Sequence, residues 1–319
     1  MSSGYLNQDQ ELELLSALDS RAVSPLKFTY IGDGYRRWID IAKKSREEMT
    51  IQFEENILKT ESLPFILREA ARDTDTVNIV DFGCGDGMPM IPVLEYLLPS
   101  VRVRYIAVDI SPKMIEAAKR TVSERFPGVE ILSVLFDFEK GEVLQDILKL
   151  TKAPRTRNYF FLLGNTLGNF DNTDKVLSNL KLSMFPNDAL VIGNQISNSL
   201  ASQRFVEYYR TREVFDLVSS TLTGYGMRCS FKEYSVRWND AKKQIEMFLT
   251  MGSDKRISLV GHDVEFEKGE ELLMAVSKKF AEETIVQTFN DVGFRMDFFS
   301  VNKKKNVCIA SISPTRYHS

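Results

Sequence analysis

Val77-Asn-Ile-Val-Asp-Phe-Gly-Cys-Gly-Asp-Gly87 combines a short apolar run, an acid and three glycines at alternate positions. The run predicts a buried strand over residues 77–82, and Gly83, Gly85 and Gly87 predict a tight turn after it. Glycine suits such a turn because it adopts backbone angles that other residues avoid, and because a missing Cβ lets a ligand approach the backbone. Alone, this pattern is as typical of a structural turn as of a nucleotide-binding loop.

Apolar strands and amphipathic helices alternate on the carboxyl side of this stretch. Such alternation predicts right-handed crossovers and a doubly wound, Rossmann-like α/β sheet that is covered by helices on both faces. The predicted strands are 77–82, 103–109, 131–136, 159–163 and 189–194, and the predicted helices are 88–98, 112–124 and 173–184.

In the remainder of the chain the strands and helices no longer alternate regularly, which predicts a second α+β lobe. Before the sheet we expect helices over 9–19 and 35–70 with an ordered loop at 25–35. After residue 196 we expect helices over 200–222, 270–280 and 282–291, strands over 227–237, 244–251 and 256–266, and a hairpin of 294–301 with 306–312.

Composition excludes several classes of function. The 319 residues carry a net charge of −3, from 41 basic and 44 acidic side chains, so no overall positive field attracts nucleic acid or an anionic membrane. Three scattered cysteines and two histidines provide no zinc pattern. The scatter of the cysteines favours a reducing compartment. The N-terminus resembles no signal peptide, and no apolar run approaches the about 20 residues of a membrane span. We expect a cytoplasmic protein without a metal, nucleic-acid or membrane partner.

Acidic residues close the second and third predicted strands. Asp109 is placed to accept hydrogen bonds from ribose hydroxyls, and Asp137 to approach the amine edge of a base while Phe138 packs on its ring. Each acid alone is equally well explained as a turn cap. Together with the glycine turn, however, they lie at the carboxyl ends of successive strands, where doubly wound sheets bind ligands.

The character of the glycine turn favours one ligand. Asp81 and Asp86 are acidic, and no Gly-Lys-Ser/Thr segment follows, which disfavours a triphosphate. S-adenosylmethionine (SAM), a nucleoside with a cationic sulfur and an ammonium group, fits better. A dinucleotide is the alternative, but the Gly-x-Gly-x-x-Gly spacing is absent because position 88 is Met.

These residues resemble a known family. Val80-Asp-Phe-Gly-Cys-Gly-Asp-Gly87 and Tyr105-Ile-Ala-Val-Asp-Ile-Ser111 are similar to the first two motifs of class I methyltransferases. Phe161-Leu-Leu-Gly-Asn-Thr-Leu-Gly-Asn-Phe170 is similar to the histidine-specific α-N-methyltransferases of ergothioneine biosynthesis. Further similar segments are Lys27-Phe-Thr-Tyr-Ile-Gly-Asp-Gly34, Gln244-Ile-Glu-Met-Phe-Leu249 and Phe266-Glu-Lys-Gly-Glu-Glu-Leu-Leu-Met-Ala-Val-Ser-Lys-Lys-Phe280.

The resemblance implies roles for individual positions. Asn169 would hold the amino or carboxylate group of the substrate, and Tyr208 or Tyr209 would hold its carboxylate or pass a proton outward. The resemblance places Tyr30, Gly34 and Asn165 at the methyl donor, with the glycine turn, Asp109, Asp137 and Phe138, and it places Met247, Ala275 and Ser277 around the substrate side chain.

Two positions depart from the family pattern. Pro89 stands where the family usually has a lysine, so the carboxylate of SAM must be held differently. Ala275-Val-Ser277 replaces Glu-x-Ser, whose glutamate pairs with the imidazole of histidine. Loss of a charge-assisted hydrogen bond, typically worth ~1.5–3 kcal/mol, weakens discrimination for histidine and leaves an apolar lining. Relatives of this family act on tryptophan derivatives, which makes an aromatic amino acid a candidate.

The resemblance implies a SAM-dependent N-methyltransferase acting on the α-amino group of an amino acid, preferably an aromatic, tryptophan-like one. The alternatives are a histidine α-N-methyltransferase, a class I methyltransferase of another specificity, and a non-catalytic SAM-binding scaffold. We expect a SAM-binding core at 61–196 plus 281–319 and a substrate-binding lobe at 1–60 plus 197–280.

Overall fold

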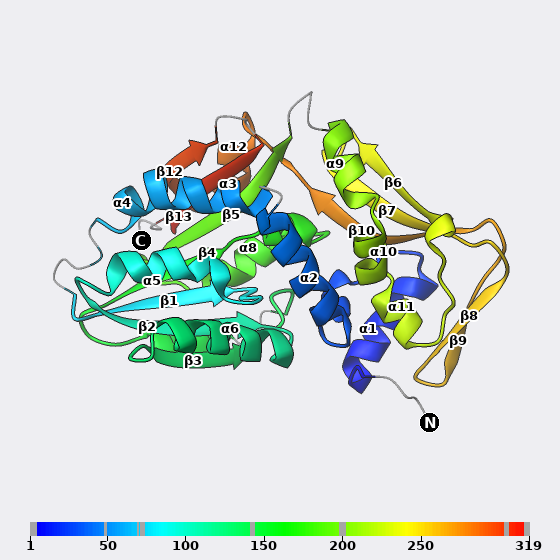
Figure 1. The fold of residues 1–319 in the computed structure, drawn as a ribbon, viewed down its shortest axis with the longest axis horizontal. Coiled ribbons are helices and arrows are strands. Elements are labelled where there is room, and N and C mark those ends of the chain that lie inside the picture. Colours follow the sequence, from blue (N-terminus) through cyan, green and yellow to red (C-terminus); the bar gives the residue numbers. More distant parts are fainter. Residues whose placement is uncertain are drawn as a thin grey trace. The chain divides into compact units, whose positions relative to one another are not determined.

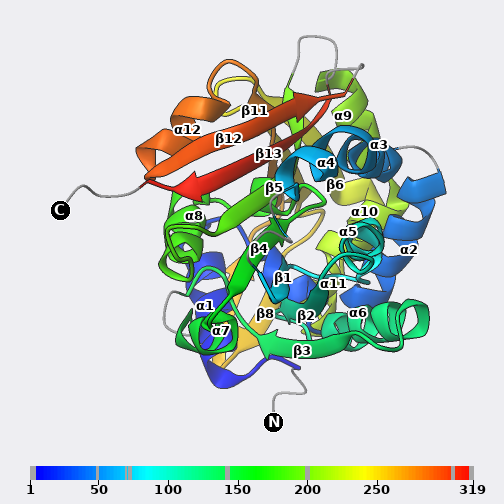
Figure 2. The same ribbon diagram turned by 90° about the vertical axis from the view of Figure 1, so that its left-hand side faces the viewer.

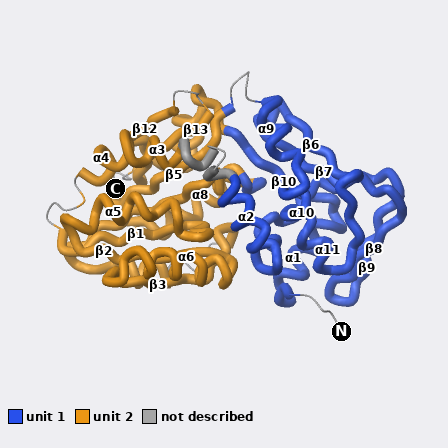
Figure 3. The backbone as a smooth tube through the Cα atoms, in the orientation of Figure 1, with its two compact units in different colours: residues 1–44, 169–171, 197–279 blue, residues 45–168, 172–196, 280–319 orange. Residues whose placement is uncertain are grey.

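The computed structural model describes residues 5–47, 50–68, 70, 74–140, 144–197, 202–302 and 306–315. The chain divides into two compact units (Figure 3). Unit 1 contains residues 1–44, 169–171 and 197–279, and unit 2 contains residues 45–168, 172–196 and 280–319. Residues 45–60 therefore belong with the large sheet, whereas the sequence groups them with the second lobe.

Unit 2 is built on an eight-stranded sheet within the described residues. Its strand order is β12-β13-β5-β4-β1-β2-β3, with β11 paired to β5 (Figure 2). The five strands from β5 to β3 run parallel, while β13 is antiparallel to β5 and to β12. This confirms the predicted doubly wound α/β sheet. The strands are β1 (Thr76–Phe82), β2 (Arg102–Asp109), β3 (Glu130–Leu135), β4 (Thr156–Leu162), β5 (Ala189–Ser197), β11 (Phe280–Ala281), β12 (Phe294–Val301) and β13 (Val307–Pro314).

Helices join the strands of unit 2 (Figure 1). Ser111 caps the longest of those after the glycine turn, because its side chain accepts a hydrogen bond from the backbone of Met114 and Pro112 occupies the first helical position. The helices are α3 (Thr50–Ile57), η2 (Leu58–Ser62), α4 (Leu63–Ile66), η3 (Met88–Met90), α5 (Ile91–Leu97), α6 (Pro112–Arg125), α7 (Leu144–Thr151), η5 (Thr166–Asn169), α8 (Thr173–Leu182) and α12 (Ile285–Asp291).

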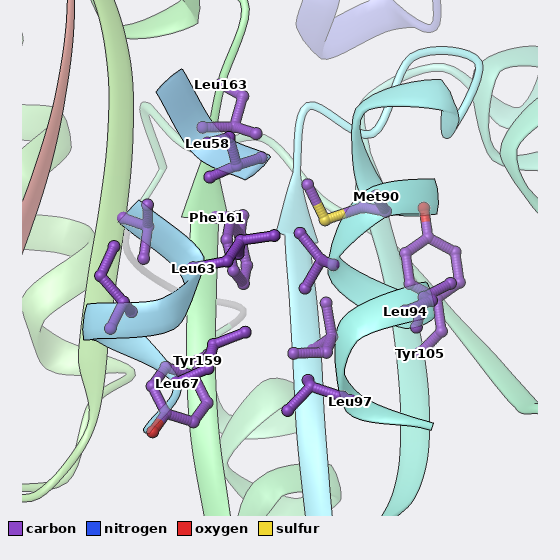
Figure 4. Close-up of a cluster of buried hydrophobic side chains, with 14 of the residues drawn as sticks. Leu58, Leu63, Leu67, Met90, Leu94, Leu97, Tyr105, Tyr159, Phe161 and Leu163 are labelled. Carbon is purple, nitrogen blue, oxygen red and sulfur yellow. The ribbon is translucent and has the colours of Figure 1, made fainter. Parts of the chain in front are cut away.

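The central strands of unit 2 are buried on both faces, which explains their continuous apolar sequences. Tyr159 and Phe161 of β4 point to one face, and Phe160 points to the other, where it stacks on Phe82. Figure 4 shows the first face. There the sheet side chains meet leucines from two helical segments, η2–α4 and α5, and the labelled members are Leu58, Leu63, Leu67, Met90, Leu94, Leu97, Tyr105, Tyr159, Phe161 and Leu163.

Unit 1 combines helices with two antiparallel sheets, one of order β10-β7-β6 and one hairpin β8-β9. Its core includes Leu14, Phe28, Phe215 and Ile245. The elements are α1 (Gln8–Asp19), η1 (Leu26–Tyr30), α9 (Ser202–Tyr209), α10 (Arg212–Val218), α11 (Ser220–Gly224), η6 (Phe231–Glu233), β6 (Tyr234–Asn239), β7 (Gln244–Thr250), β8 (Lys255–Leu259), β9 (His262–Phe266) and β10 (Glu271–Lys278), and α2 (Gly34–Glu47) leads from unit 1 into unit 2.

The predicted helix over 270–280 is wrong. Glu, Leu, Met, Ala and Lys favour helices locally, but this segment forms β10, which pairs with β7 along its length. Cross-strand pairing and burial of Leu272, Met274 and Val276 outweigh the local preference.

Other predicted boundaries also change. The strand predicted over 256–266 is the hairpin β8-β9, because Val260 and Gly261 both adopt positive φ (51° and 78°), as a two-residue turn requires. Valine is unusual there, so the sequence shows no turn signal. The helix predicted over 200–222 is three short helices, the loop at 25–35 contains η1, the strand predicted over 227–237 begins only at Tyr234, and α7 was not predicted.

Asp81 provides a test of this core. Its side chain, 4% exposed at the end of β1, accepts a hydrogen bond of 2.8 Å from the Tyr105 hydroxyl. Burial raises the pKa of Asp81 to about 7, with the Tyr105 hydrogen bond opposing the shift. A raised carboxyl pKa favours the protonated form in the folded state, so its stabilising contribution is present at low pH and is lost as pH rises towards about 7.

We therefore expect Asp81→Asn, which keeps an acceptor for Tyr105, to gain stability relative to the unchanged protein as pH rises from 4 to 7. The gain is on the order of a few kcal/mol, because one pKa unit corresponds to about 1.4 kcal/mol. Denaturant unfolding of both proteins across this pH range measures it. A difference that is independent of pH contradicts the assignment.

Candidate functional site

The glycine turn of unit 2 is held in a left-handed conformation. Gly83, Gly85 and Gly87 have φ of 67°, 52° and 73°, a region that residues with a Cβ rarely adopt. The backbone N–H groups of Gly83 and Cys84 both donate to the Val108 carbonyl, at 2.8 and 3.2 Å. The turn is thereby fixed to the end of β2.

Asp109 is buried beside this turn, with 7% of its surface exposed. One carboxylate oxygen accepts from the Gly85 backbone at 3.4 Å and the other from the Ser111 backbone at 2.9 Å. Burial raises the pKa of Asp109 to about 6, while these backbone hydrogen bonds oppose the shift. At neutral pH the side chain is therefore an anionic acceptor next to the glycine turn.

Phe138 and Asp137 follow β3. Phe138 packs edge-on against Phe82, with ring centroids 5.4 Å apart, and lies close enough to the glycine turn that a Cβ on Gly83 would come within 3.8 Å of its ring. Asp137 is half-buried, and its carboxylate accepts a hydrogen bond of 3.0 Å from the Glu139 backbone, as a turn cap does. The structure thus brings Phe138 to the turn and gives Asp137 a local partner.

The loop after β4 is held by two buried side chains of unit 2. Asn165 has φ of 60° and accepts a hydrogen bond of 3.0 Å from the Gln195 backbone through its side-chain oxygen. Both carboxylate oxygens of Glu54 accept from the Gly164 backbone, at 3.0 and 3.1 Å. A Cβ at Gly193 would overlap the Glu54 carboxylate, so the glycine leaves the space that this carboxylate occupies. Burial raises the pKa of Glu54 to about 7, and the Gly164 hydrogen bond opposes the shift.

Three of the predicted substrate residues share one face of the sheet in unit 1. Ala275 of β10 pairs directly with Met247 of β7, and Ser277 lies two residues further along β10. Side chains two residues apart on a strand point to the same face. All three are buried, with at most 2% exposed, and Met247 and Ala275 belong to the apolar core of unit 1.

Polar groups gather at the Ser277 end of this face. The hydroxyls of Tyr209 and Ser277 are 2.9 Å apart, and Ser277 donates to the side-chain oxygen of Asn169 at 3.3 Å. Tyr208 meets Tyr209 edge-on, with centroids 5.2 Å apart. Tyr234 fixes the end of α9 by donating to the Tyr209 carbonyl at 2.9 Å. The structure therefore brings Asn169, Tyr209 and Ser277 into one hydrogen-bonded group.

Tyr30 and Gly34 also belong to unit 1. Tyr30 is half-buried and close enough to Tyr209 to raise its pKa, although burial is the larger cause. Gly34 is buried, and a Cβ there would lie 1.8 Å from the Thr29 carbonyl. Close packing at the start of α2 thus accounts for a glycine at this position, and its predicted place at the methyl donor stays a prediction.

Sequence reasoning missed two buried charged residues. Glu54 lies in an acidic helical segment without a distinguishing motif, and only the glycine at 193 in the middle of a strand signals a close approach. Lys279 is 2% exposed and donates to the hydroxyls of Ser277 and Tyr209, at 2.6 and 3.1 Å. Lys279 follows β10 directly, two residues after Ser277, a spacing that places side chains on one side of an extended chain. The prediction of a helix over 270–280 concealed that signal.

The described residues contain no cluster of three His, Cys, Asp or Glu side chains that could hold a metal ion. They also include no helix of the length and hydropathy that a membrane span needs.

The residues at the turn fit SAM. The three left-handed glycines carry no Cβ and Gly83 is partly exposed, the buried Asp109 carboxylate suits a ribose diol, and residues 83–87 carry no basic side chain that would favour a triphosphate. Phe138 offers an aromatic surface beside the turn.

Comparisons of the sequence with known proteins point to one family. The model of a family described as histidine-specific, SAM-dependent methyltransferases matches residues 10–313. The histidine N-alpha-methyltransferase of Mycolicibacterium smegmatis is 28% identical over 257 residues, which cover 76% of this chain and 75% of that protein. The histidine N-alpha-methyltransferase of Mycobacterium tuberculosis is 29% identical over 196 residues, which cover 57% of this chain and 58% of that protein. A solved structure that matches is magnesium protoporphyrin IX methyltransferase from Synechocystis PCC 6803 with bound SAH (S-adenosylhomocysteine). The match covers 91% of this chain and 98% of that protein, with 12% sequence identity and a TM-score of 0.49.

The buried acid after β2 gives a direct test of the donor site. We expect Asp109→Ala to weaken the binding of S-adenosylhomocysteine (SAH) by roughly 10- to 100-fold, because hydrogen bonds to a charged group contribute about 1.5–3 kcal/mol. Isothermal titration calorimetry measures the affinity for SAH. Asp137→Ala is the comparison variant, and we expect it to lose less affinity because Asp137 is half-buried. Unchanged affinity in Asp109→Ala contradicts the site.

Proposed function

The chain belongs to the family of histidine-specific, SAM-dependent methyltransferases, and we propose that it methylates the α-amino group of an amino acid with an aromatic side chain. It is a SAM-dependent methyltransferase, and SAM is its cofactor. The amine acceptor and its side-chain preference are the proposed parts.

The observation that carries the proposal is the hydrogen-bonded group of Asn169, Ser277 and Tyr209. Asn169 follows β4 by seven residues, and its side-chain oxygen accepts from Ser277. The amide of Asn169 has an acceptor oxygen with two lone pairs and an NH2 group with two donors. The oxygen suits the ammonium of an amino acid, and the NH2 group suits its carboxylate. In the proposed arrangement the Tyr209 hydroxyl, 2.9 Å from Ser277 Oγ, turns its one hydrogen to the substrate carboxylate.

Methyl transfer from SAM demands little covalent chemistry from the protein. Bound SAM supplies the methyl group as an activated sulfonium. The side chains of this chain have to orient the amine, exclude water and keep the amine unprotonated. In the proposed arrangement Asn169 and Tyr209 orient the acceptor, and the buried Met247 and Ala275 shield it from water.

The alanine at position 275 favours an acceptor with an aromatic side chain. It is fully buried and paired with Met247, so that part of the sheet face offers apolar contacts and no partner for an imidazole N–H. The relatives are named for histidine. Histidine is accordingly the second candidate acceptor, and Ser277 is the polar group that favours it.

A panel of the twenty amino acids, incubated with the protein and SAM carrying a labelled methyl group, tests the function. We expect mass spectrometry to show labelled α-N-methyl product, with a higher kcat/KM for tryptophan or tyrosine than for histidine. Absence of any methylated amino acid, with SAH binding intact, overturns the proposed class of acceptor. A clear preference for histidine overturns the aromatic assignment alone.

Substitution of Ala275 tests the side-chain pocket. We expect Ala275→Glu to raise the ratio of kcat/KM for histidine over tryptophan by roughly 10- to 100-fold, because a charge-assisted hydrogen bond to imidazole is worth about 1.5–3 kcal/mol. Ala275→Gln has the same size without the charge and should change the ratio by less. An equal ratio in all three proteins means that position 275 does not contact the substrate side chain.

A further inference from the structure

Lys279 carries a buried amine to which the proposed function assigns no role. It follows β10 directly, and only 2% of its surface is exposed. Its Nζ lies 2.6 Å from Ser277 Oγ and 3.1 Å from Tyr209 Oη. Its backbone N–H donates to the Lys243 carbonyl at 2.8 Å, which fixes the residue in position.

The surroundings of Lys279 do not compensate a positive charge well. Its Nζ lies over the rings of Phe205 and Tyr209, 5.3 and 4.9 Å from their centroids, and it forms no ion pair with any acidic residue that the structure describes. An ammonium buried without a counter-ion is costly. Burial accordingly holds the pKa of Lys279 well below its ordinary value.

The titratable groups that face this amine are tyrosines. Tyr209 of α9 contacts it directly, while Tyr208 of α9, Tyr30 of η1 and Tyr234 of β6 adjoin Tyr209. Burial raises the pKa of Tyr209 and of Tyr234, so both phenols remain protonated at neutral pH. Lys279 is therefore the strongest base in this group, and the hydroxyls can only relay a proton.

The hydroxyls connect Lys279 to the proposed acceptor site. Ser277 Oγ lies between Lys279 Nζ and the Asn169 side-chain oxygen, 2.6 Å from the first and 3.3 Å from the second. Tyr209 Oη contacts both Ser277 and Lys279. The distances of 2.6, 2.9 and 3.1 Å that join Lys279 Nζ and the two hydroxyls are in the range over which hydroxyl groups transfer protons.

An amino acid presents its α-amine mainly as ammonium at neutral pH, and an ammonium has no lone pair to methylate. On the basis of the proposed function, we propose that Lys279 takes up the proton of the substrate's α-ammonium group through the hydroxyl of Ser277 or Tyr209. An N–H bond of the ammonium breaks, the hydroxyl receives that proton and passes its own to Nζ, and a free amine and a lysine ammonium result. Solvent takes the proton from Lys279 after product leaves.

The pH dependence of kcat/KM tests this relay. We expect Lys279→Met, which keeps the apolar stem and removes the amine, to lose roughly 100-fold in kcat/KM at pH 7, which is within the range for proton transfer by a positioned group. The loss should shrink about tenfold per pH unit, and the variant should approach the unchanged protein once the substrate amine deprotonates in solution. Lys242→Met, the same change on an exposed turn, should leave the profile unaltered.

Two outcomes overturn the proposal. A loss that is equal at every pH shows that Lys279 only supports the structure, and a raised KM with an unchanged profile shows that it anchors the substrate carboxylate. SAH binding by each variant, measured by calorimetry, reports whether the variant has folded. If the unchanged protein methylates no amine at all, the proposed function fails, and the relay fails with it.

A titration of the unchanged protein gives an independent readout. In protein labelled with 13C at the lysine ε-carbon, we expect one NMR resonance to titrate well below the ordinary lysine value of about 10.4, because burial disfavours the charged form. If every lysine titrates near that ordinary value, Lys279 is charged at neutral pH and the relay is excluded, whatever the variants do.

Discussion

The left-handed turn between β1 and η3 is the constraint on which unit 2 depends. Gly83 and Cys84 both donate to the carbonyl of Val108, so the end of β1, the end of β2 and the turn form one rigid corner. Three glycines are needed because each has a positive φ. Because Asp109 accepts from Gly85 within this corner, the turn also fixes the acid in the place where we propose that it contacts a ribose.

The loop after β4 is held by a second buried acid. Glu54 receives the Gly164 N–H in the space that Gly193 leaves, and Asn165 is tied to β5. A fixed loop matters because Asn169 follows four residues later and carries the proposed contact with the amine. In unit 1, Ser277, Tyr209 and Lys279 complete a group in which a buried amine, hydroxyls and an amide are adjacent. In the proposed mechanism this group orients an amino acid and also removes a proton from it.

The sequence predicts the parallel sheet, the glycine turn and the acid after β2, because alternating apolar segments and glycine spacing are local signals. It does not predict that residues 271–278 form a strand, since their helix-favouring composition is overruled by pairing with β7. The same error hid Lys279, whose place beside Ser277 depends on a two-residue period. Glu54 was missed for a different reason, because its partner Gly164 is 110 residues away in the sequence.

The central claim is that this methyltransferase modifies the α-nitrogen of an amino acid. The most direct measurement is two-dimensional NMR of the product formed with 13C-methyl SAM and the preferred amino acid. The account predicts a long-range correlation between the new methyl group and the α-carbon. A methyl group that correlates with a side-chain or carboxylate carbon instead contradicts it.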